Sequence, residues 1–381
     1  MIGEPTPQGH TNRVFGVGQY LRNLVTEFAN VDSDIQFILW SSAARHGTPQ
    51  WLDSLVRSHK NFSAVHIKLP NRLVDRAAYW SRLRFLPGIV GPIDVSWEVN
   101  YFPLKPRHAY SICTVHDLSF LRPEFQRNHA YNELAATDAA LADKITTVSE
   151  TSKLKILSTL DDLTSDRVQV VYGAAAPLFD ISPPEHRSAA VRDAYQLPAS
   201  YFMYAGEAAA RKNLGNLIRA FQAVRRKRPE SHLLMAGLLE HELTALMTQV
   251  GETADLTNVR VVGYVPQEDL QVLYQQSEAL VYPSFDEGFG LPIVEAMKMG
   301  QIVVASDIPA SHEVARDAAL FVTPDRHESI AEGMIEALIM SDEERRLRIE
   351  KGFDAANRFS WSRSRDRMLE LFEEGFRENR P

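Results

Sequence analysis

Short apolar runs recur along the chain and alternate with longer mixed stretches of helical length. Runs that are apolar at nearly every position are typical of strands buried on both faces of a parallel sheet. We therefore expect an α/β fold. The expected strands are residues 35–40, 94–99, 111–115, 142–148, 168–172, 201–205, 232–237, 259–263, 279–282, 302–305, 313–317 and 321–324. The expected helices are residues 19–30, 187–195, 214–225, 270–278, 329–341, 342–353 and 361–378.

The start of the chain departs from this pattern. Only Met1 and Ile2 precede a turn-rich stretch at residues 3–9, whereas an α/β domain normally opens with a buried strand of several residues. Either the first strand is very short, or the numbered chain begins inside a longer natural protein. We prefer the second interpretation.

Length and composition narrow the class of protein. At 381 residues the chain is too long for one ordinary core and predicts two domains. It has no long apolar window, and no basic segment followed by an apolar core at its start, so we expect neither a membrane span nor a signal peptide. The single cysteine, Cys113, excludes an internal disulfide and fits a reducing cytoplasm. Acidic residues outnumber basic ones by 49 to 41, which argues against nucleic-acid binding.

The stretch 278–306 combines a strand, a glycine-containing loop, a helix and a second strand. Pro292 suits the first turn of the helix, and Gly300 suits its C-terminal cap. Gly288 and Gly290 therefore lie at the carboxyl end of a strand, just before a helix N-terminus. Backbone N–H groups and the positive end of the helix dipole meet there, which favours a phosphate.

Two carboxylates, Glu287 and Glu295, flank the glycines of this loop. Carboxylates repel phosphate, but they accept hydrogen bonds from the hydroxyls of a sugar or a ribose. A ligand that carries both phosphates and hydroxyls explains the combination. The alternative is a solvated acidic loop that binds nothing.

Two other strand ends carry charged side chains. Arg211 and Lys212 lie between strand 201–205 and the next helix, where fixed cations would neutralise a departing diphosphate. His116 and Asp117 end strand 111–115, at the sheet edge where α/β domains place functional groups. The alternatives are solvated charges at a helix start and a histidine that caps a turn.

Two further short motifs are weaker evidence for a functional site. Gly16 and Gly18 precede a helix, but Leu21 stands where a dinucleotide fingerprint has its third glycine, so a phosphate or acceptor loop fits better than a dehydrogenase. The Asp-Ser-Asp sequence at residues 32–34 has a form used by some metal-dependent enzymes. It lies far from any glycine-rich loop and is explained by a turn, so we predict no catalytic metal.

Residues 71–88 mix arginines with aromatic and aliphatic side chains. Such a segment can lie on an anionic membrane surface or face a lipid-linked acceptor. The alternative is an ordinary surface helix with its arginines in solvent.

The two glutamates, with Gly-Phe-Gly-Leu-Pro between them, resemble the signature of the retaining glycosyltransferases of family 4. The sequences at residues 305–309 and 313–315 resemble the next loop of that family. The resemblance implies the GT-B fold, in which two doubly wound, Rossmann-like parallel-sheet domains face a cleft. It implies an acceptor-side domain at residues 1–180, a sugar-nucleotide domain at 181–360 and a helix at 361–381 that crosses back to the first domain.

The resemblance also implies roles for the candidate residues. His116 would face the transferred sugar, Glu287 would hold its hydroxyls, and Arg211 and Lys212 would bind the diphosphate. The remaining donor-binding candidates are Gly16, Gly18, Gly206, Tyr264, Val265, Phe289, Gly290, Leu291 and Glu295, the last of which would bind the ribose. Asp117 and Asn100 would lie on the acceptor side. The family often has a polar group near Ala209, or arginine near Glu207, so the donor contacts there are open.

The implied reaction moves a hexose from a nucleotide diphospho-sugar to a hydroxyl of a glycan or lipid-linked acceptor, with retention of configuration and no cofactor. We favour mannose from GDP-mannose, because His-Asp-Leu at residues 116–118 and Arg-Lys-Asn at 211–213 resemble bacterial mannosyltransferases of polysaccharide assembly. We expect a cytoplasmic protein, associated with the inner face of the membrane if residues 71–88 make that contact. The alternatives are a catalytically silent sugar-nucleotide-binding protein and a GT-B sugar-nucleotide epimerase.

Overall fold

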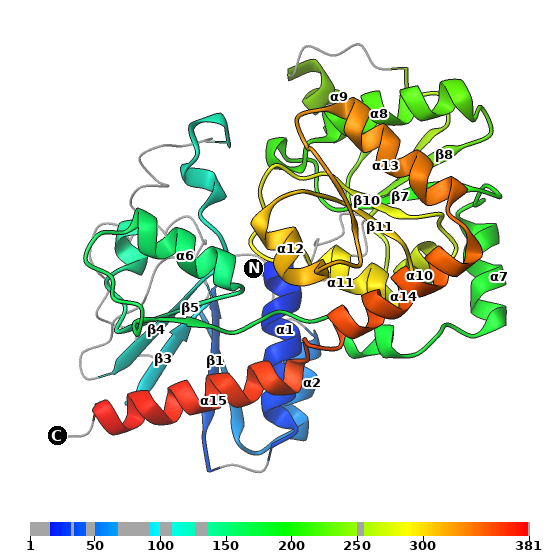
Figure 1. The fold of residues 1–381 in the computed structure, drawn as a ribbon. Coiled ribbons are helices and arrows are strands. Elements are labelled where there is room, and N and C mark those ends of the chain that lie inside the picture. Colours follow the sequence, from blue (N-terminus) through cyan, green and yellow to red (C-terminus); the bar gives the residue numbers. More distant parts are fainter. Residues whose placement is uncertain are drawn as a thin grey trace. The chain divides into compact units, whose positions relative to one another are not determined.

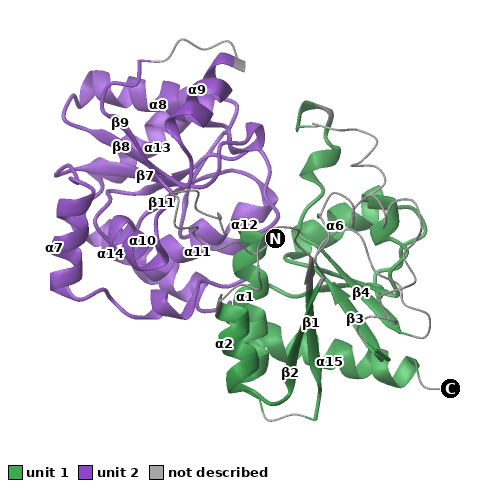
Figure 2. Cartoon of the chain, turned by 180° about the vertical axis from the view of Figure 1, so that it is seen from behind, with its two compact units in different colours: residues 1–172, 361–381 green, residues 173–360 purple. Residues whose placement is uncertain are grey.

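A computed structural model describes residues 16–31, 34–42, 50–67, 91–99, 109–125, 136–249 and 255–379. The predictions for the first strand, for Asn100, for residues 71–88 and for Asp32 and Ser33 lie outside these residues. The chain divides into two compact units (Figure 2), coloured green for residues 1–172 with 361–381 and purple for residues 173–360. We call them unit 1 and unit 2 and describe each by itself.

Unit 2 is built on a parallel sheet of six strands in the order β12-β11-β10-β7-β8-β9. Most of its strands carry buried side chains at nearly every position, which explains their continuous apolar sequences. The strands are β7 (Tyr201–Ala205), β8 (His232–Ala236), β9 (Val259–Gly263), β10 (Leu280–Tyr282), β11 (Val303–Ser306) and β12 (Leu320–Val322).

Helices cover both faces of this sheet, so the expected doubly wound arrangement is present (Figure 1). One group is α8 (Leu214–Lys227), α9 (Glu240–Gln249) and α13 (His327–Ile339). The other is α7 (Glu185–Ala194), α10 (Gln267–Gln275), α11 (Leu291–Lys298), α12 (Pro309–Ala315) and α14 (Asp342–Ala356). Two short 3-10 helices, η3 (Pro177–Asp180) and η4 (Ala210–Lys212), complete the unit.

The strand predicted at residues 313–317 is wrong, because α12 occupies most of that stretch. Pro309 lies in the first turn of α12, where its ring favours a helix start. Val314 and Ala315 are apolar because they lie on the buried side of this helix, and Arg316, at φ 51°, ends it. Helix α10 also begins three positions earlier than the predicted residue 270, directly after Pro266.

Unit 1 has two parallel sheets among its described residues. One joins β1 (Phe37–Ser42) to β2 (Phe62–Ile67), and the other has the order β3-β4-β5-β6. Its four strands are β3 (Val95–Glu98), β4 (Tyr110–Val115), β5 (Lys144–Thr147) and β6 (Val168–Val170). The helices are α1 (Gly16–Ala29), α2 (Gln50–Ser58), α6 (Glu150–Thr159) and α15 (Trp361–Glu378), with short 3-10 helices η1 (Ser119–Leu121) and η2 (Pro123–Phe125).

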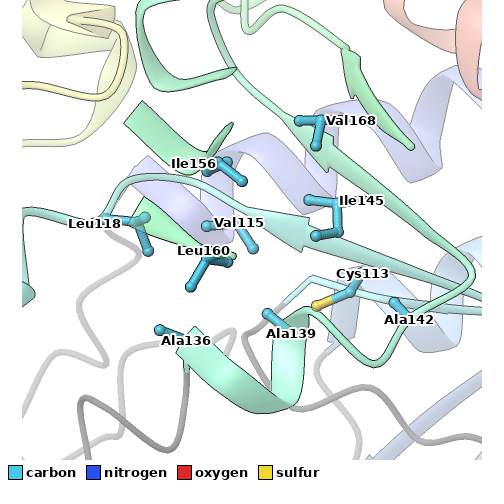
Figure 3. Close-up of a cluster of buried hydrophobic side chains, with 10 residues drawn as sticks. All are labelled: Cys113, Val115, Leu118, Ala136, Ala139, Ala142, Ile145, Ile156, Leu160 and Val168. Carbon is cyan, nitrogen blue, oxygen red and sulfur yellow. The ribbon is translucent and has the colours of Figure 1, made fainter. Parts of the chain in front are cut away.

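One core of unit 1 lies where β4 and β5 meet the residues around α6 (Figure 3). Ser149 caps the N-terminus of α6, because its hydroxyl accepts a 2.9 Å hydrogen bond from the N–H of Ser152. Cys113 is a fully buried member of this core. The cluster consists of Cys113, Val115, Leu118, Ala136, Ala139, Ala142, Ile145, Ile156, Leu160 and Val168.

Helix α15 packs on α1, β3 and β4, so the last helix of the chain completes unit 1 (Figure 1). The Phe372 ring lies 5.6 Å from Phe28 and 6.0 Å from Trp97, between ring centroids. Gly375 lies so close to the sheet that a Cβ there would be 2.4 Å from the Tyr110 ring. No helix in the described part of the chain is long and apolar enough to cross a membrane.

Candidate active site

The turn that follows β7 requires glycine. Gly206 has φ 156°, and a Cβ on it would lie 2.7 Å from the hydroxyl of Tyr204. Gly237, which follows the neighbouring strand β8, has φ 91°, and its Cβ would lie 2.8 Å from the carbonyl oxygen of Gly206. The two backbones can approach this closely only without side chains. The turn after β7 is therefore held against the next strand at the carboxyl edge of the sheet.

Asn213 fixes the end of the 3-10 turn η4, which carries the two predicted cations. It adopts a left-handed conformation with φ 59°, which asparagine tolerates better than most residues. Its side-chain amide donates to the carbonyl oxygens of Pro283 (2.8 Å) and Pro324 (2.6 Å). The N–H of Phe285 donates to the carbonyl oxygen of Arg211 at 2.8 Å. These bonds tie the turn to the segments that follow β10 and β12.

Arg211, Lys212 and Glu287 form one buried ionic cluster. Lys212 Nζ lies 2.6 Å from Glu287 Oε1 and 2.6 Å from the hydroxyl of Tyr282. Arg211 donates to Glu287 Oε2 at 3.2 Å and to Glu207 Oε1 at 3.0 Å. The side chains of Lys212 and Glu287 are each only 7% exposed. The structure therefore brings together three of the four residues predicted to contact the transferred sugar or the diphosphate, the fourth being His116.

The charges of this cluster depend on one another. Burial opposes ionisation of Glu287, but the adjacent Lys212 and Arg211 outweigh it and hold the pKa of Glu287 at about 2. Burial lowers the pKa of Lys212, and the Glu287 carboxylate opposes that change. Burial, followed by the same carboxylate, raises the pKa of the Tyr282 hydroxyl. Tyr282 therefore stays protonated while Lys212 donates to its oxygen.

The loop after β10 leads into α11 through Gly290, which has φ 104° and precedes the first turn of the helix. Phe289 packs edge-on against Phe359, with ring centroids 5.0 Å apart. The side chains of Phe289 and Leu291 also border Gly173, since a Cβ there would meet each of them at 3.3 Å. Pro292 stands in the first turn and Gly300, at φ 68°, follows the end of the helix, both as predicted.

Glu295 projects from α11 into the interior of unit 2, where its carboxylate accepts a 3.0 Å hydrogen bond from the hydroxyl of Tyr274. Burial raises the pKa of Glu295 to about 7, and the bond from Tyr274 opposes this increase. Tyr264 and Val265 follow β9. Val265 is buried, whereas Tyr264 is partly exposed.

His116 follows β4 in unit 1 and is partly buried, with its Nε2 atom out of contact with solvent. Its ring lies edge-on to Tyr20, 5.1 Å between centroids, and the Tyr20 hydroxyl donates to the carbonyl oxygen of Val171. Burial lowers the pKa of His116 to about 4, against the opposing effects of Asp117 and the carbonyl of Val99. Within the described residues, Nε2 of His116 is buried without a hydrogen-bond partner.

The other unit 1 candidates have different surroundings. Asp117 accepts hydrogen bonds from the N–H (3.0 Å) and hydroxyl (2.7 Å) of Ser119, which stabilise the turn into η1. Gly16 and Gly18 lie within the first turn of α1, so the prediction of a loop before a helix starting at residue 19 is wrong. A glycine early in a helix leaves the same local sequence as a glycine loop, and the two cannot be told apart by pattern.

Three contacts of the site escaped the sequence analysis: Tyr282 beside Lys212, Tyr274 beside Glu295, and Glu207 beside Arg211. The two tyrosines lie in apolar stretches, where a buried ring is the ordinary explanation. Their only distinguishing signal is that a buried tyrosine hydroxyl needs a partner. Among the described residues, no group of three or more histidine, cysteine, aspartate or glutamate side chains could hold a metal ion.

The chain is similar in sequence to known glycosyltransferases. Residues 194–353 match the family model described as "Glycosyl transferases group 1". The chain is 32% identical over 275 residues to the O-antigen chain mannosyltransferase B of Escherichia coli, covering 70% of this chain and 71% of the relative. It is 29% identical over 256 residues to the O-antigen chain mannosyltransferase RfbU of Salmonella typhimurium, covering 66% and 67%.

A solved structure agrees with the fold. Anabaena HepE, in complex with UDP and glucose, superposes with a TM-score of 0.70 and covers 96% of this chain and 97% of its own. Its sequence identity of 14% supports a statement about the fold alone.

Proposed function

The chain belongs to the group 1 glycosyltransferases and has the GT-B fold, and from this premise we propose that it transfers mannose from GDP-mannose to a hydroxyl of a glycan or lipid-linked acceptor. The proposed reaction is that of the retaining enzymes of family 4 and needs no metal. Its product belongs to cell-surface polysaccharide or glycolipid assembly, because the relatives are named for the O-antigen chain.

The observation that carries the proposal is the cluster of Arg211, Lys212 and Glu287 at the carboxyl edge of the unit 2 sheet. Ligands of α/β sheets bind beside this edge. A nucleotide diphospho-sugar offers an anionic diphosphate for the two cations and sugar hydroxyls for the carboxylate. Leaving a cation buried without a partner is costly, so Glu287 also keeps Lys212 paired when no donor is bound.

We assign the departing diphosphate to Arg211 and Lys212, whose positive charges stabilise the negative charge that develops as the glycosidic bond breaks. The N-terminal turn of α11, preceded by Phe289 and Gly290, contributes backbone N–H groups and a favourable dipole. Glu287 accepts hydrogen bonds from the sugar hydroxyls, and Glu295 accepts them from the ribose. The transition state resembles an oxocarbenium ion, as in other glycosyl transfers.

His116 is proposed to contact the transferred sugar. Burial keeps its imidazole neutral at physiological pH, with a pKa of about 4, so it would act as a hydrogen-bonding group and not as a cation. Asp117 and Asn100 are proposed for the acceptor side. Residues 71–88 are proposed to contact the membrane surface, which would place the enzyme in the cytoplasm at the inner face of the membrane.

The test is a thermal-shift panel of GDP-mannose, UDP-glucose, UDP-N-acetylglucosamine and dTDP-rhamnose. A ligand at a hundred times its Kd stabilises the folded state by about 2.7 kcal/mol, which is readily measured. We expect a rise in Tm with GDP-mannose in the wild type and a smaller rise in Lys212→Ala.

Lys351→Ala is the matched control, because Lys351 forms an exposed ion pair with Asp317 away from the site. It should respond to GDP-mannose like the wild type. A shift with a different sugar nucleotide would overturn the donor assignment, and the absence of any shift would overturn the proposed function. Release of GDP only when a polyprenol-linked glycan is added separates transfer from silent binding and from epimerisation.

A further inference from the structure

Tyr274 and Glu295 form an isolated polar contact between two helices. Tyr274 lies on α10 and Glu295 on α11, and the hydroxyl meets carboxylate oxygen Oε2 at 3.0 Å. Both residues are buried, Tyr274 completely and Glu295 to within 5%. A carboxylate in such surroundings is costly unless hydrogen bonds hold it. The contact is therefore the feature that permits a charged Glu295 in the interior.

The direction of this hydrogen bond follows from the two pKa values. Burial, followed by the charge of Glu295, raises the pKa of Tyr274 well above its usual value. Tyr274 is thus protonated and donates, while Glu295 accepts. Because the bond stabilises the ionised carboxylate, it opposes the burial that raises the pKa of Glu295 to about 7.

Several charged groups on the elements around α11 have partners other than Glu295. Lys298 of α11 pairs with Asp180 of η3, and Tyr282 of β10 bonds with Lys212. On α12, His312 pairs with Asp307. On α10, Asp269 pairs with Arg187, and on α14 the pairs are Arg346 with Glu350, Arg348 with Glu336 and Lys351 with Asp317. Arg345 of α14 donates to the carbonyl oxygens of Glu278 and Ala337.

We propose that Tyr274 is a positioning residue for donor binding, whose hydroxyl holds the Glu295 carboxylate ready to accept hydrogen bonds from the ribose hydroxyls of the sugar nucleotide. This inference rests on the proposed function, since Glu295 has no ribose to bind in a protein of another class. Tyr274 itself contacts no substrate and acts through Glu295.

The surroundings of Tyr274 suit a positioning role. Its ring packs against Phe179 of η3, with centroids 6.1 Å apart and planes inclined at 60°. Helix α10 also contacts α11 and η3 directly. A tyrosine ring has two side-chain torsions, so packing of the ring fixes the position of its hydroxyl. The carboxylate is thereby held before any ligand arrives.

The chain offers a matched control in Tyr201. This tyrosine of β7 is equally buried, and its hydroxyl donates to the carbonyl oxygen of Leu273 at 2.9 Å. Leu273 precedes Tyr274 on α10. Tyr201→Phe therefore removes a buried tyrosine hydroxyl bonded to the same helix and leaves Glu295 untouched.

The experiment measures kcat and KM for GDP-mannose between pH 5.5 and 9 in the wild type, Tyr274→Phe, Tyr201→Phe and Glu295→Gln. Removal of a hydrogen bond to a charged group is worth about a tenfold change. We expect Tyr274→Phe to raise KM about tenfold with kcat changed less than about twofold. Its acid limb in kcat/KM should move to higher pH, because the bond that favours ionisation is gone.

Tyr201→Phe should keep the wild-type KM and pH profile, and Glu295→Gln should lose the acid limb. If Tyr274→Phe has the same pH profile and KM as Tyr201→Phe, the inference is overturned. The proposed function still stands in that case, provided that the wild type transfers the sugar. Failure of the wild type to bind any sugar nucleotide would overturn both.

A measurement on the wild type alone covers the case in which Tyr274→Phe does not fold. The Kd of GDP should increase more steeply as the pH falls below 7 than that of 2′,3′-dideoxy-GDP. The Kd of the dideoxy nucleotide should be higher at pH 7 and change only with protonation of the terminal phosphate that both nucleotides share. Equal affinities and equal pH dependence of the two nucleotides would overturn the inference.

Discussion

Lys212 and Glu287 meet at 2.6 Å between Nζ and Oε1, although 75 positions separate them along the chain. Each is nearly enclosed, and each depends on the other for its charge. Buried ion pairs of this kind often add little net stability, because desolvation opposes the attraction between the charges. We explain the pair by the proposed function, in which it holds a cation beside the sheet edge where the donor would bind.

Glu287→Gln should destabilise unit 2 by about 3–5 kcal/mol at pH 7, because Lys212 then keeps a buried charge without its partner. The folded pKa of Glu287, about 2, lies below the usual 4.5, so its ionisation stabilises the fold above pH 4.5. That contribution is lost as the pH falls from about 4.5 towards 2. Denaturant unfolding of both proteins should show a difference at pH 7 that shrinks below pH 4.5. A difference that does not change with pH would contradict this account.

Glu295 should make the free energy of unfolding depend on pH in the opposite direction to Glu287. Its folded pKa of about 7 lies above the usual 4.5, so the folded state retains a proton that the unfolded state releases. Stability is therefore full below pH 4.5 and declines as the pH rises towards 7, by about 2–3 kcal/mol. In urea unfolding, the free energy of unfolding of Glu295→Gln should rise relative to that of the wild type as the pH increases from 4.5 to 7. Parallel curves for the two proteins would show that the carboxyl titrates normally.

Glu207→Gln should strengthen donor binding. Glu207 bonds Arg211 at 3.0 Å and places a negative charge where we expect a diphosphate. The Glu207 side chain is 39% exposed, so its pair contributes less than about 1 kcal/mol to stability. We expect KM for GDP-mannose to fall by about two- to fivefold with little change in Tm.

The control for that variant is Glu350→Gln, which breaks the exposed pair with Arg346, also four positions away along the chain. It should leave KM unchanged. A rise in KM for Glu207→Gln would instead mean that Glu207 holds Arg211 in its working position.

Gly206→Ala should cost about 1–3 kcal/mol, since the new Cβ would meet the Tyr204 hydroxyl at 2.7 Å and the residue has positive φ. Tyr204→Phe removes that hydroxyl and its bond to the carbonyl oxygen of Glu207. The double variant should therefore be less destabilised than the sum of the two single variants. Additive losses of unfolding free energy would place the cost in the backbone alone.

The sequence predicted the strands better than it predicted the site. Strands β7 and β9 have the predicted bounds. Strand β7 is buried and apolar at every position, whereas β9 is only partly buried and is marked by its three valines. The strand prediction for residues 313–317 was wrong because a short helix with one buried side also has a brief apolar run in its sequence. The pairing of Lys212 with Glu287 could not be read from spacing, since it depends on which strands become neighbours.

The contacts of the two buried tyrosines could not be predicted for another physical reason. Tyr274 and Tyr282 have the burial that their apolar surroundings predict, and only the position of the hydroxyl distinguishes them from core residues. Sequence patterns report which face of an element is buried, not where a ring ends. Glu287 and Glu295 were distinguishable because they flank a glycine-containing loop that precedes a helix, where carboxylates are unexpected beside a phosphate site.

Helix α15 belongs to unit 1 although the whole of unit 2 precedes it along the chain. During synthesis, all residues of unit 2 are made before the helix that packs on β3 and β4. Because domains generally fold as units while the chain emerges, unit 2 can fold first, and unit 1 must wait with Trp97 and Tyr110 uncovered. A chain truncated after residue 360 should therefore contain a folded unit 2 joined to a unit 1 that binds chaperones and is sensitive to proteases.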